Sequence, residues 1–102
     1  MSVFTKKVQI VWNKVGYGEL IHTTPPASVS AAEVELNAKT AEMVANNKMA
    51  DETGVYENGG TITVNKKLSN SDAADEWLDF NTEFASKYGF TMISSKVFQS
   101  TI

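Results

Sequence analysis

Residues 54–89 read GVYENGGTITVNKKLSNSDAADEWLDFNTEFASKYG, and this stretch decides the fold that the sequence predicts. The tripeptide Asn-Gly-Gly at 58–60 separates two short runs rich in β-branched and aromatic residues. Asn-Gly favours a two-residue type I′ turn, because both central residues of that turn need a positive φ. The first half of the stretch is therefore predicted to be a β-hairpin, with Ile62 and Val64 pointing inward.

The second half predicts an amphipathic helix that follows the hairpin directly. Ser69 or Ser71 is expected to cap its N-terminus, and Gly89 is expected to be the C′ residue that ends it. Three acidic residues fill its first turns, where negative charge complements the helix dipole. The side chains expected on its buried face are Ala74, Trp77, Leu78, Phe84, Ala85 and Tyr88, with Phe80 at the margin. This helix is expected to supply most of the core.

Period-two alternation predicts one strand over residues 3–13 and a last strand over residues 90–98. Residues 14–29, with glycines at 16 and 18 and prolines at 25 and 26, are predicted to form a long connection. In the first strand, one face is expected to carry Phe4, Val8, Ile10 and Trp12, and the other Lys7, Gln9 and Asn13 together with Val3 and Val11.

A further helix is predicted over residues 30–47. Ser30 and Glu33 have the spacing of a capping box at its start. Its sheet-facing side is expected to carry Val34, Ala38, Ala41 and Ala45, flanked by Val44. Leu36 and Met43 then point away from the sheet, either exposed or in contact with a second subunit.

The resulting order predicts an α+β fold, a ferredoxin-like βαββαβ two-layer sandwich formed by one domain over residues 1–102. Right-handed crossovers give an antiparallel sheet in the order 4-1-3-2 with both helices on one face. The apolar residues expected on the uncovered face are Val3, Val11, Met92 and Phe98. A contiguous exposed apolar patch normally marks an interaction surface. We therefore expect a homodimer through this face, with the side of Leu36 and Met43 as the alternative.

Composition narrows the function classes. The 102 residues are 42% hydrophobic and 21% charged, with no cysteine, which excludes disulfides and thiol chemistry. The net charge of −3 and the pI near 5.0 disfavour nucleic acid as a partner, although they leave a local basic patch open. The N-terminal residues do not resemble a signal peptide, and no apolar run is long enough to span a membrane. A cytoplasmic protein of a bacterial or infected host cell is expected.

The chain resembles the dimeric α/β-barrel group of ferredoxin-like proteins, and in particular small uncharacterised proteins of T4-like marine phages and ocean metagenomes. The resemblance rests on the turn at 58–60, the helix start at 69–72 and the aromatic residues that follow it, and it covers nearly the whole chain. These aromatic and terminal residues are Trp77, Phe80, Tyr88, Gly89, Phe90 and Thr91. It implies the fold and dimerisation. Enzymes of the barrel group use placed His, Asn or Trp residues, but none of their motifs matches here, so no role is transferred.

One candidate ligand pocket lies at the end of the sheet where the first strand finishes. Trp12, Tyr17, His22 and Tyr56 are expected to approach one another there. The alternative is that these aromatic residues only seal the core beneath the long connection. His22 is the single histidine and has no companion ligand or carboxylate nearby in the sequence, so it also fits a structural role.

A candidate anion patch lies at the opposite end of the sheet. It comprises Lys6, Lys7, Lys66, Lys67 and Lys96. A helix N-terminus nearby favours an anion, whereas acidic residues at the same end oppose one, and lysines on strand edges also protect against aggregation. A patch of this kind would bind nucleic acid with steeply salt-dependent affinity.

No other pattern is specific. Asp72, Asp75 and Glu76 fit dipole partners better than cation ligands, and the Gly-x-Gly at 16–18 lacks the context of a nucleotide site. No catalytic residue, metal or cofactor is expected. The sequence predicts a non-enzymatic homodimeric binding protein, and the alternative is a small-molecule binding protein or cofactor-free enzyme of the monooxygenase-like barrel type.

Overall fold

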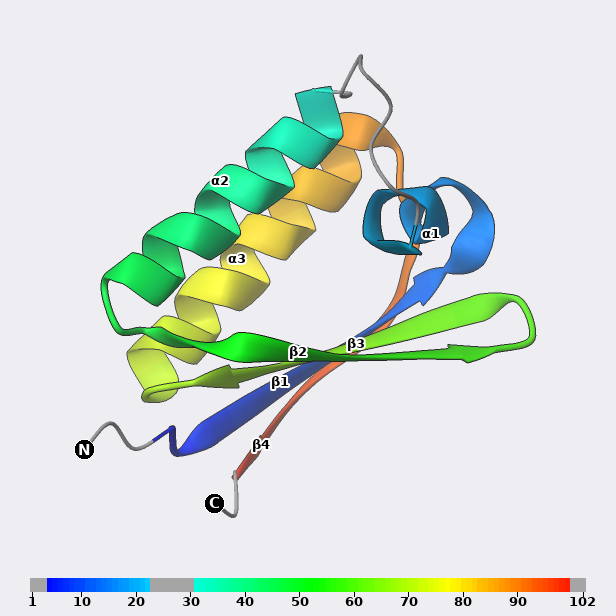
Figure 1. Cartoon of the computed structure of the whole chain (residues 1–102). Helices are drawn as coiled ribbons and strands as arrows, with labels where there is room; N and C mark the ends of the chain where they lie inside the picture. Colours follow the sequence, from blue (N-terminus) through cyan, green and yellow to red (C-terminus); the bar gives the residue numbers. More distant parts are fainter. Residues whose placement is uncertain (1–3, 23–30, 100–102) are drawn as a thin grey trace.

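The computed structural model describes residues 4–22 and 31–99 (Figure 1). Over these residues the elements run β1 (Lys6–Asn13), α1 (Lys14–His22), α2 (Ala31–Ala45), β2 (Met49–Asn58), β3 (Thr61–Leu68), α3 (Ser71–Tyr88) and β4 (Met92–Gln99). The chain is thus α+β, as the sequence predicts.

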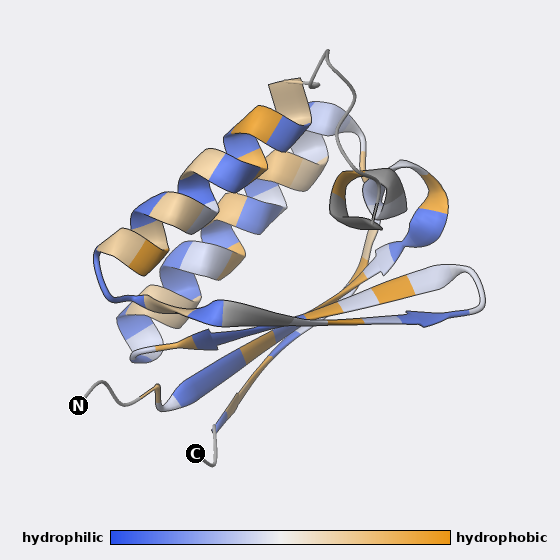
Figure 2. Cartoon of the chain, in the orientation of Figure 1, coloured by the Kyte–Doolittle hydropathy of each residue, from blue (hydrophilic) through white to orange (hydrophobic). Residues whose placement is uncertain are grey.

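The described strands form one four-stranded antiparallel sheet in the order β2-β3-β1-β4, which reads β4-β1-β3-β2 from the opposite edge. The helices all lie over the same face of this sheet, and α2 and α3 run side by side (Figure 1). Polar and apolar residues alternate along the strands (Figure 2). One face of the sheet is therefore packed on the helices and the other is open.

The core lies between the sheet and α3. β1 contributes Val8, Ile10 and Trp12, each at most 2% exposed, while Trp77 and Phe84 reach down from α3. The buried face of α3 is confirmed: its predicted residues are buried or half-buried against this cluster. Burying each large apolar side chain contributes about 2 kcal/mol, so this layer holds most of the hydrophobic stabilisation.

The C-terminal cap of α3 is the predicted residue, whereas the N-terminal cap is not. Gly89 ends the helix with a φ of 74°, and the next N–H, that of Phe90, donates to Ala85 O at 3.0 Å. The N-cap is Asn70 rather than either neighbouring serine, because its side-chain oxygen accepts from Ala73 N–H at 2.9 Å. Asn, Asp and Ser cap helices about equally well, so residue type could not separate these neighbours.

The predicted buried face of α2 is wrong. Leu36 and Met43 are buried, whereas Val34 is 56% exposed and the alanines at 38, 41 and 45 are exposed. The helix is turned because burying Leu and Met removes more apolar surface from water than burying alanines. These two side chains are consequently not available for a second subunit. Ser30, the predicted N-cap, lies outside the described residues.

The end of α2 carries a feature that the sequence did not reveal. Asn47 has a φ of 61°, Asn47 N–H donates to Val44 O at 3.0 Å, and Lys48 N–H donates to Met43 O at 2.9 Å. This pair of bonds is a Schellman motif with asparagine in place of the usual glycine. It ends the helix two residues earlier than predicted and turns the chain into β2.

The hairpin between β2 and β3 forms at the predicted residues but with a different turn. Gly59 has a φ of 63°, while Gly60 does not have a positive φ. A positive φ at the first central position alone is the pattern of type II′, not of the predicted type I′. β2 also begins earlier than predicted, at Met49. Its pairing with β3 shifts register between Met49 and Thr53, so the intervening residues do not follow the regular pattern.

The connection predicted over 14–29 is helical in its first part. Val15 and Gly16 have non-helical dihedral angles, and Gly16 has a φ of 84°, so the chain turns there before the helical part of α1. A Cβ on Gly16 would lie 3.3 Å from the Phe90 ring. Glycine therefore fits this position for two reasons: it adopts a positive φ without strain, and it has no Cβ to crowd the Phe90 ring. The two prolines lie outside the described residues.

A bulge in β4 takes one predicted residue off the open face, whereas Val11 and Phe98 lie on that face as predicted. The pairing of β4 with β1 shifts between Val11 and Trp12, so that Ser94 pairs with Val11 but Met92 pairs with Trp12. Directly paired residues share a face, and Met92 indeed packs against the core. The prediction that Met92 lies with Phe98 on the open face is wrong, because one extra residue reverses the alternation. Val3 lies outside the described residues.

Candidate functional site

The candidate pocket at the end of β1 is a packed aromatic cluster in its described part. Trp12 and Tyr17 are stacked, with ring centroids 4.1 Å apart and an interplanar angle of 12°, and both are at most 2% exposed. Phe90 meets Tyr17 edge-on at 5.4 Å. Burial raises the pKa of the Tyr17 hydroxyl, which keeps it protonated. Trp12 and Tyr17 thus seal the core beneath α1.

The other two residues of that candidate pocket do not join this cluster. Tyr56 pairs with Thr63 on the open face of the sheet and is 61% exposed. Since Trp12 points to the helices, the sheet separates it from Tyr56. The side chain of His22 lies outside the described residues.

A cavity of about 290 Å³ lies near this cluster, between α1, α2 and the sheet. Its lining is formed by Tyr17, Leu20, Leu36, Asn37, Thr40, Val55, Val64, Lys66 and Trp77. Sequence reasoning missed it because Leu36 was expected to face outward. Its size is at the lower end of the range for small-molecule sites.

The lysines of the predicted anion patch are divided between the two faces of the sheet. Burial alternates along β1 and β3, which places Lys7 and Lys67 on the open face and Lys66 among the helices. Lys96 pairs with Gln9, so it also lies on the open face. Lys6 shares the alternation of Val8 and donates to Gln99 Oε1 at 3.2 Å. The period of two was visible in the sequence and could have revealed this division.

The Lys66 side chain is buried beneath the helices, beside Trp77. It is 8% exposed, and its Nζ lies 5.6 Å from the centre of the Trp77 ring. Burial lowers the pKa of Lys66, and the negative charge of Asp51 partly opposes that change. Its four-carbon stem belongs to the core layer. Lys66 is therefore not part of an exposed basic surface.

Lys7 and Lys67 stand directly opposite each other on the two central strands. Like charges in a cross-strand pair destabilise a sheet. Protection of a sheet edge does not explain them, because only Lys96 of this group lies on an edge strand. Among the described residues none of the three forms a salt bridge. This like-charge pair is therefore an electrostatic cost at one end of the open surface.

We call the surface on the uncovered side of the sheet the open face. Its members are Asn58, Tyr56 and Gly54 from β2, Thr61, Thr63, Asn65 and Lys67 from β3, Lys7, Gln9, Val11 and Asn13 from β1, and Ser94, Lys96 and Phe98 from β4. Phe98 is 38% exposed, and Lys7 Nζ lies 5.0 Å from the centre of its ring. None of the residues that the register places on this face is acidic, although Asp51, in the irregular part of β2, lines the same hollow as Lys67. The surface is polar and basic rather than apolar.

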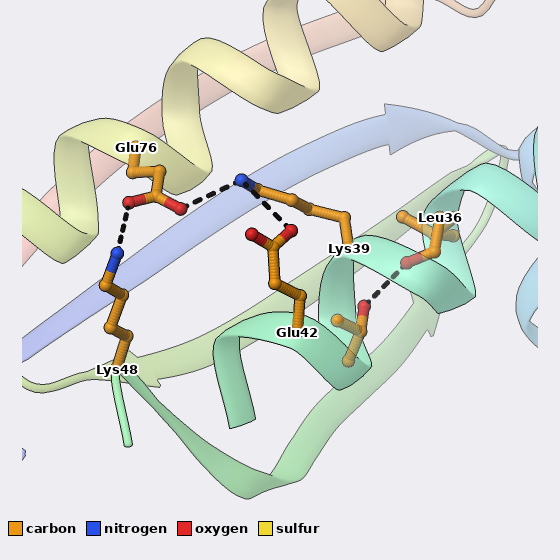
Figure 3. Close-up of polar contacts among 6 residues, drawn as sticks. Leu36, Lys39, Glu42, Lys48 and Glu76 are labelled. Carbon is orange, nitrogen blue, oxygen red and sulfur yellow. Dashed lines mark hydrogen bonds and ion pairs between the residues drawn. The ribbon is translucent and has the colours of Figure 1, made fainter. Parts of the chain in front are cut away.

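The helices carry the opposite charge. Of the twelve acidic residues in the sequence, one lies in α1, three in α2 and five in α3, and the other three lie in β2. Glu76 accepts from Lys39 Nζ at 2.8 Å and from Lys48 Nζ at 3.0 Å (Figure 3). Lys87 binds Glu35 at 2.9 Å in the same layer. The net charge of −3 therefore combines an acidic helix layer with a basic open face.

Asp72, Asp75 and Glu76 do not form a cation site. The Glu76 carboxylate bridges two ammonium groups, and hydrogen bonds from Lys39 and then Lys48 lower its pKa. Within residues 4–22 and 31–99, no group of three or more acidic or histidine side chains could hold a metal ion. Over the same residues, no helix is long and apolar enough to cross a membrane.

No protein-family model and no curated protein matches this chain. The similarity to phage proteins therefore stays a prediction.

Proposed function

We propose that this protein acts by binding a polyanionic partner through the open face, and not by catalysis. The observation that carries the proposal is the pair of lysines directly opposite each other on central strands, with a third lysine beside them. A bound anion would remove the repulsion between Lys7 and Lys67, which the free protein bears. The acidic helix layer orients the molecule, because it repels the same partner from the other side.

The arrangement of the described residues of the candidate ligand pocket favours binding over catalysis. Trp12 and Tyr17 fill the core, and Tyr56 lies across the sheet from them. Groups that act together in acid–base catalysis need to lie within hydrogen-bond reach of one substrate. These three cannot meet that condition.

The strand order supports assigning the chain to the ferredoxin-like arrangement, with α1 as an addition after β1. A homodimer of the barrel type stays a prediction. The predicted reason for it was an apolar open face, and the observed face is mainly polar and basic. The open face presents three lysines, and Met92, one of its expected apolar residues, lies on the helix side, so two copies packed through this face would bring like charges together. A polyanion fits this face better than a second copy does.

Retention on immobilised heparin tests the proposal. An acidic protein of pI near 5.0 should not be retained at pH 7 unless its basic residues are grouped. We expect wild type to be retained at low salt and the open-face variant Lys7→Gln/Lys67→Gln/Lys96→Gln to flow through. The matched control is Lys14→Gln/Lys48→Gln/Lys87→Gln, which has the same net charge but an intact open face, and it should be retained.

Two results would refute the proposal. One is flow-through of the wild-type protein at low salt. The other is equal loss of retention in both triple variants, since that would assign the binding to net charge rather than to this face.

Small-molecule binding is the second candidate, and the cavity of about 290 Å³ favours it. Its wall is mainly apolar with a few polar groups, which is the usual composition of a ligand site. A neutral apolar dye such as Nile red should bind wild type and not a Thr40→Phe variant, whose ring would occupy part of the cavity that Thr40 lines. Equal dye fluorescence with both proteins would remove this candidate.

A further inference from the structure

The two aromatic side chains of the open face identify the kind of polyanion it fits. Tyr56 is 61% exposed and Phe98 is 38% exposed, on the two edge strands β2 and β4. Exposed aromatic rings on a basic surface are the combination with which proteins hold unpaired bases, because each base presents a flat face for stacking. We infer that the partner is a single-stranded nucleic acid, an inference that rests on the proposed function of the open face.

The register places these two rings at opposite corners of the basic surface. Tyr56 shares a row with Thr63 and Val11, and Phe98 shares a row with Lys7. The rings are therefore three strand spacings and four residues apart, or roughly 20 Å at ordinary strand dimensions. This distance suits a strand of several nucleotides that crosses the sheet diagonally.

The lysines supply contacts for the phosphates of such a strand. Lys7 and Lys67 face each other, and Lys96 is the diagonal neighbour of Lys7 because its partner is Gln9. Phosphate neutralisation by three cations gives a slope of about −2 for the logarithm of the affinity against the logarithm of salt concentration on single strands. Each lysine that is removed should make this slope shallower by about 0.7.

Between the two rings the open face is covered with amides and hydroxyls. Gln9 pairs with Asn65, and Thr63 stands two residues away on the same face. Such groups donate and accept hydrogen bonds, so they can bind base edges or sugar hydroxyls. A sulfated polysaccharide or an acidic peptide would use the lysines but not the rings.

A duplex is a poorer fit than a single strand. Its base faces are hidden within the stack, so Tyr56 and Phe98 could not contact them. The order of affinity that we expect is therefore single strand above duplex of the same length.

Fluorescence anisotropy with labelled oligouridine and oligothymidine of about eight nucleotides tests the inference, with a blunt duplex of that length as comparison. The key variant is Tyr56→Leu/Phe98→Leu, which removes both rings and keeps every charge. We expect it to lose about tenfold or more in affinity for the single strands, while it is still retained on heparin. Val34→Ala, a change of an exposed apolar residue on α2, is the control and should bind as wild type does.

The outcomes separate this inference from the proposed function. Loss of single-strand binding with heparin retention intact supports both. Heparin retention with duplex bound as tightly as the single strands, or with the two-ring variant unaffected, overturns the single-strand inference and leaves the proposed function. Displacement of the bound strand by polyglutamate at equal charge concentration would also overturn it, because an acidic peptide would then be an equal partner. Thermal unfolding of each variant checks that the fold is retained.

Discussion

At the scale of single residues, Glu76 links the electrostatics to stability. Its carboxylate accepts from Lys39 and Lys48, and these bonds lower its pKa below the ordinary value of 4.5 (Figure 3). A carboxylate with a lowered pKa in the folded state stabilises the protein above its ordinary pKa, and this contribution is lost as the pH falls through the lower value.

Glu76→Gln should therefore reduce the free energy of unfolding at pH 7 and have little effect below the folded-state pKa. Urea unfolding at pH 7, 4.5 and 3 measures this difference. Glu83→Gln, an exposed acidic residue of the same helix, serves as the matched control. A stability difference between wild type and Glu76→Gln that does not change with pH would contradict the assignment.

Asn70 is the other single residue with a specific role. Its side-chain oxygen accepts from Ala73 N–H at the start of α3. Asn70→Ala should lower the free energy of unfolding by about 1 kcal/mol, measured by chemical denaturation. Ser71→Ala, one position further along, should change the free energy of unfolding by much less. A larger loss for Ser71→Ala than for Asn70→Ala would mean that the serine caps the helix.

At the scale of elements, the orientation of α2 has a direct consequence for stability. Met43 is fully buried and Val34 is 56% exposed. Met43→Ala should cost about 2–5 kcal/mol because it leaves a cavity in the core. Val34→Ala should stay within about 0.5 kcal/mol of wild type. Equal losses in denaturant unfolding would mean that the helix is not turned as described.

The pairing of β1 with β3 predicts a variant that is more stable than wild type. Lys67→Thr removes the charge opposite Lys7 and should raise the free energy of unfolding by about 0.2–1 kcal/mol at low salt. The gain should shrink at high salt, where repulsion is screened. Lys96→Thr is the control, because Lys96 stands opposite the neutral Gln9. If the gain in stability does not depend on salt, the higher β-propensity of threonine would explain it instead of the lost repulsion.

The sequence predicted those elements whose signals are local. The alternation of Val8, Ile10 and Trp12 and the glycine at the end of α3 both specify structure within a few residues. The face of α2 depends on competition between two sides of one helix, in which the larger Leu36 and Met43 are buried in preference to a row of alanines. The bulge in β4 depends on the partner strand and leaves no local signal.

The candidate site was predictable in its residues but not in its arrangement. The lysines of the anion patch were identified, and strand alternation then divided them into an exposed group and a group on the helix side. The pocket residues were dispersed for the same reason, since Tyr56 and Trp12 belong to opposite faces. In both cases, residues at the same end of the sheet lie on opposite faces of it, because side chains alternate along each strand.

At the scale of the whole molecule, charge is separated between the two layers. Nine acidic residues lie in the helices, while the open face carries Lys7, Lys67 and Lys96. Net charge alone disfavoured nucleic acid, and this separation removes that objection. Because a field of this kind steers association, the rate of binding should fall steeply with ionic strength.

Amide chemical-shift mapping shows residue by residue whether a single strand binds the open face. The labelled protein is titrated at low salt with oligouridine of about eight nucleotides. We expect shifts at open-face residues such as Gln9, Thr63 and Asn65, and none along the exposed sides of α2 and α3. Shifts confined to the helix layer, or no shifts at millimolar oligonucleotide, would contradict this expectation.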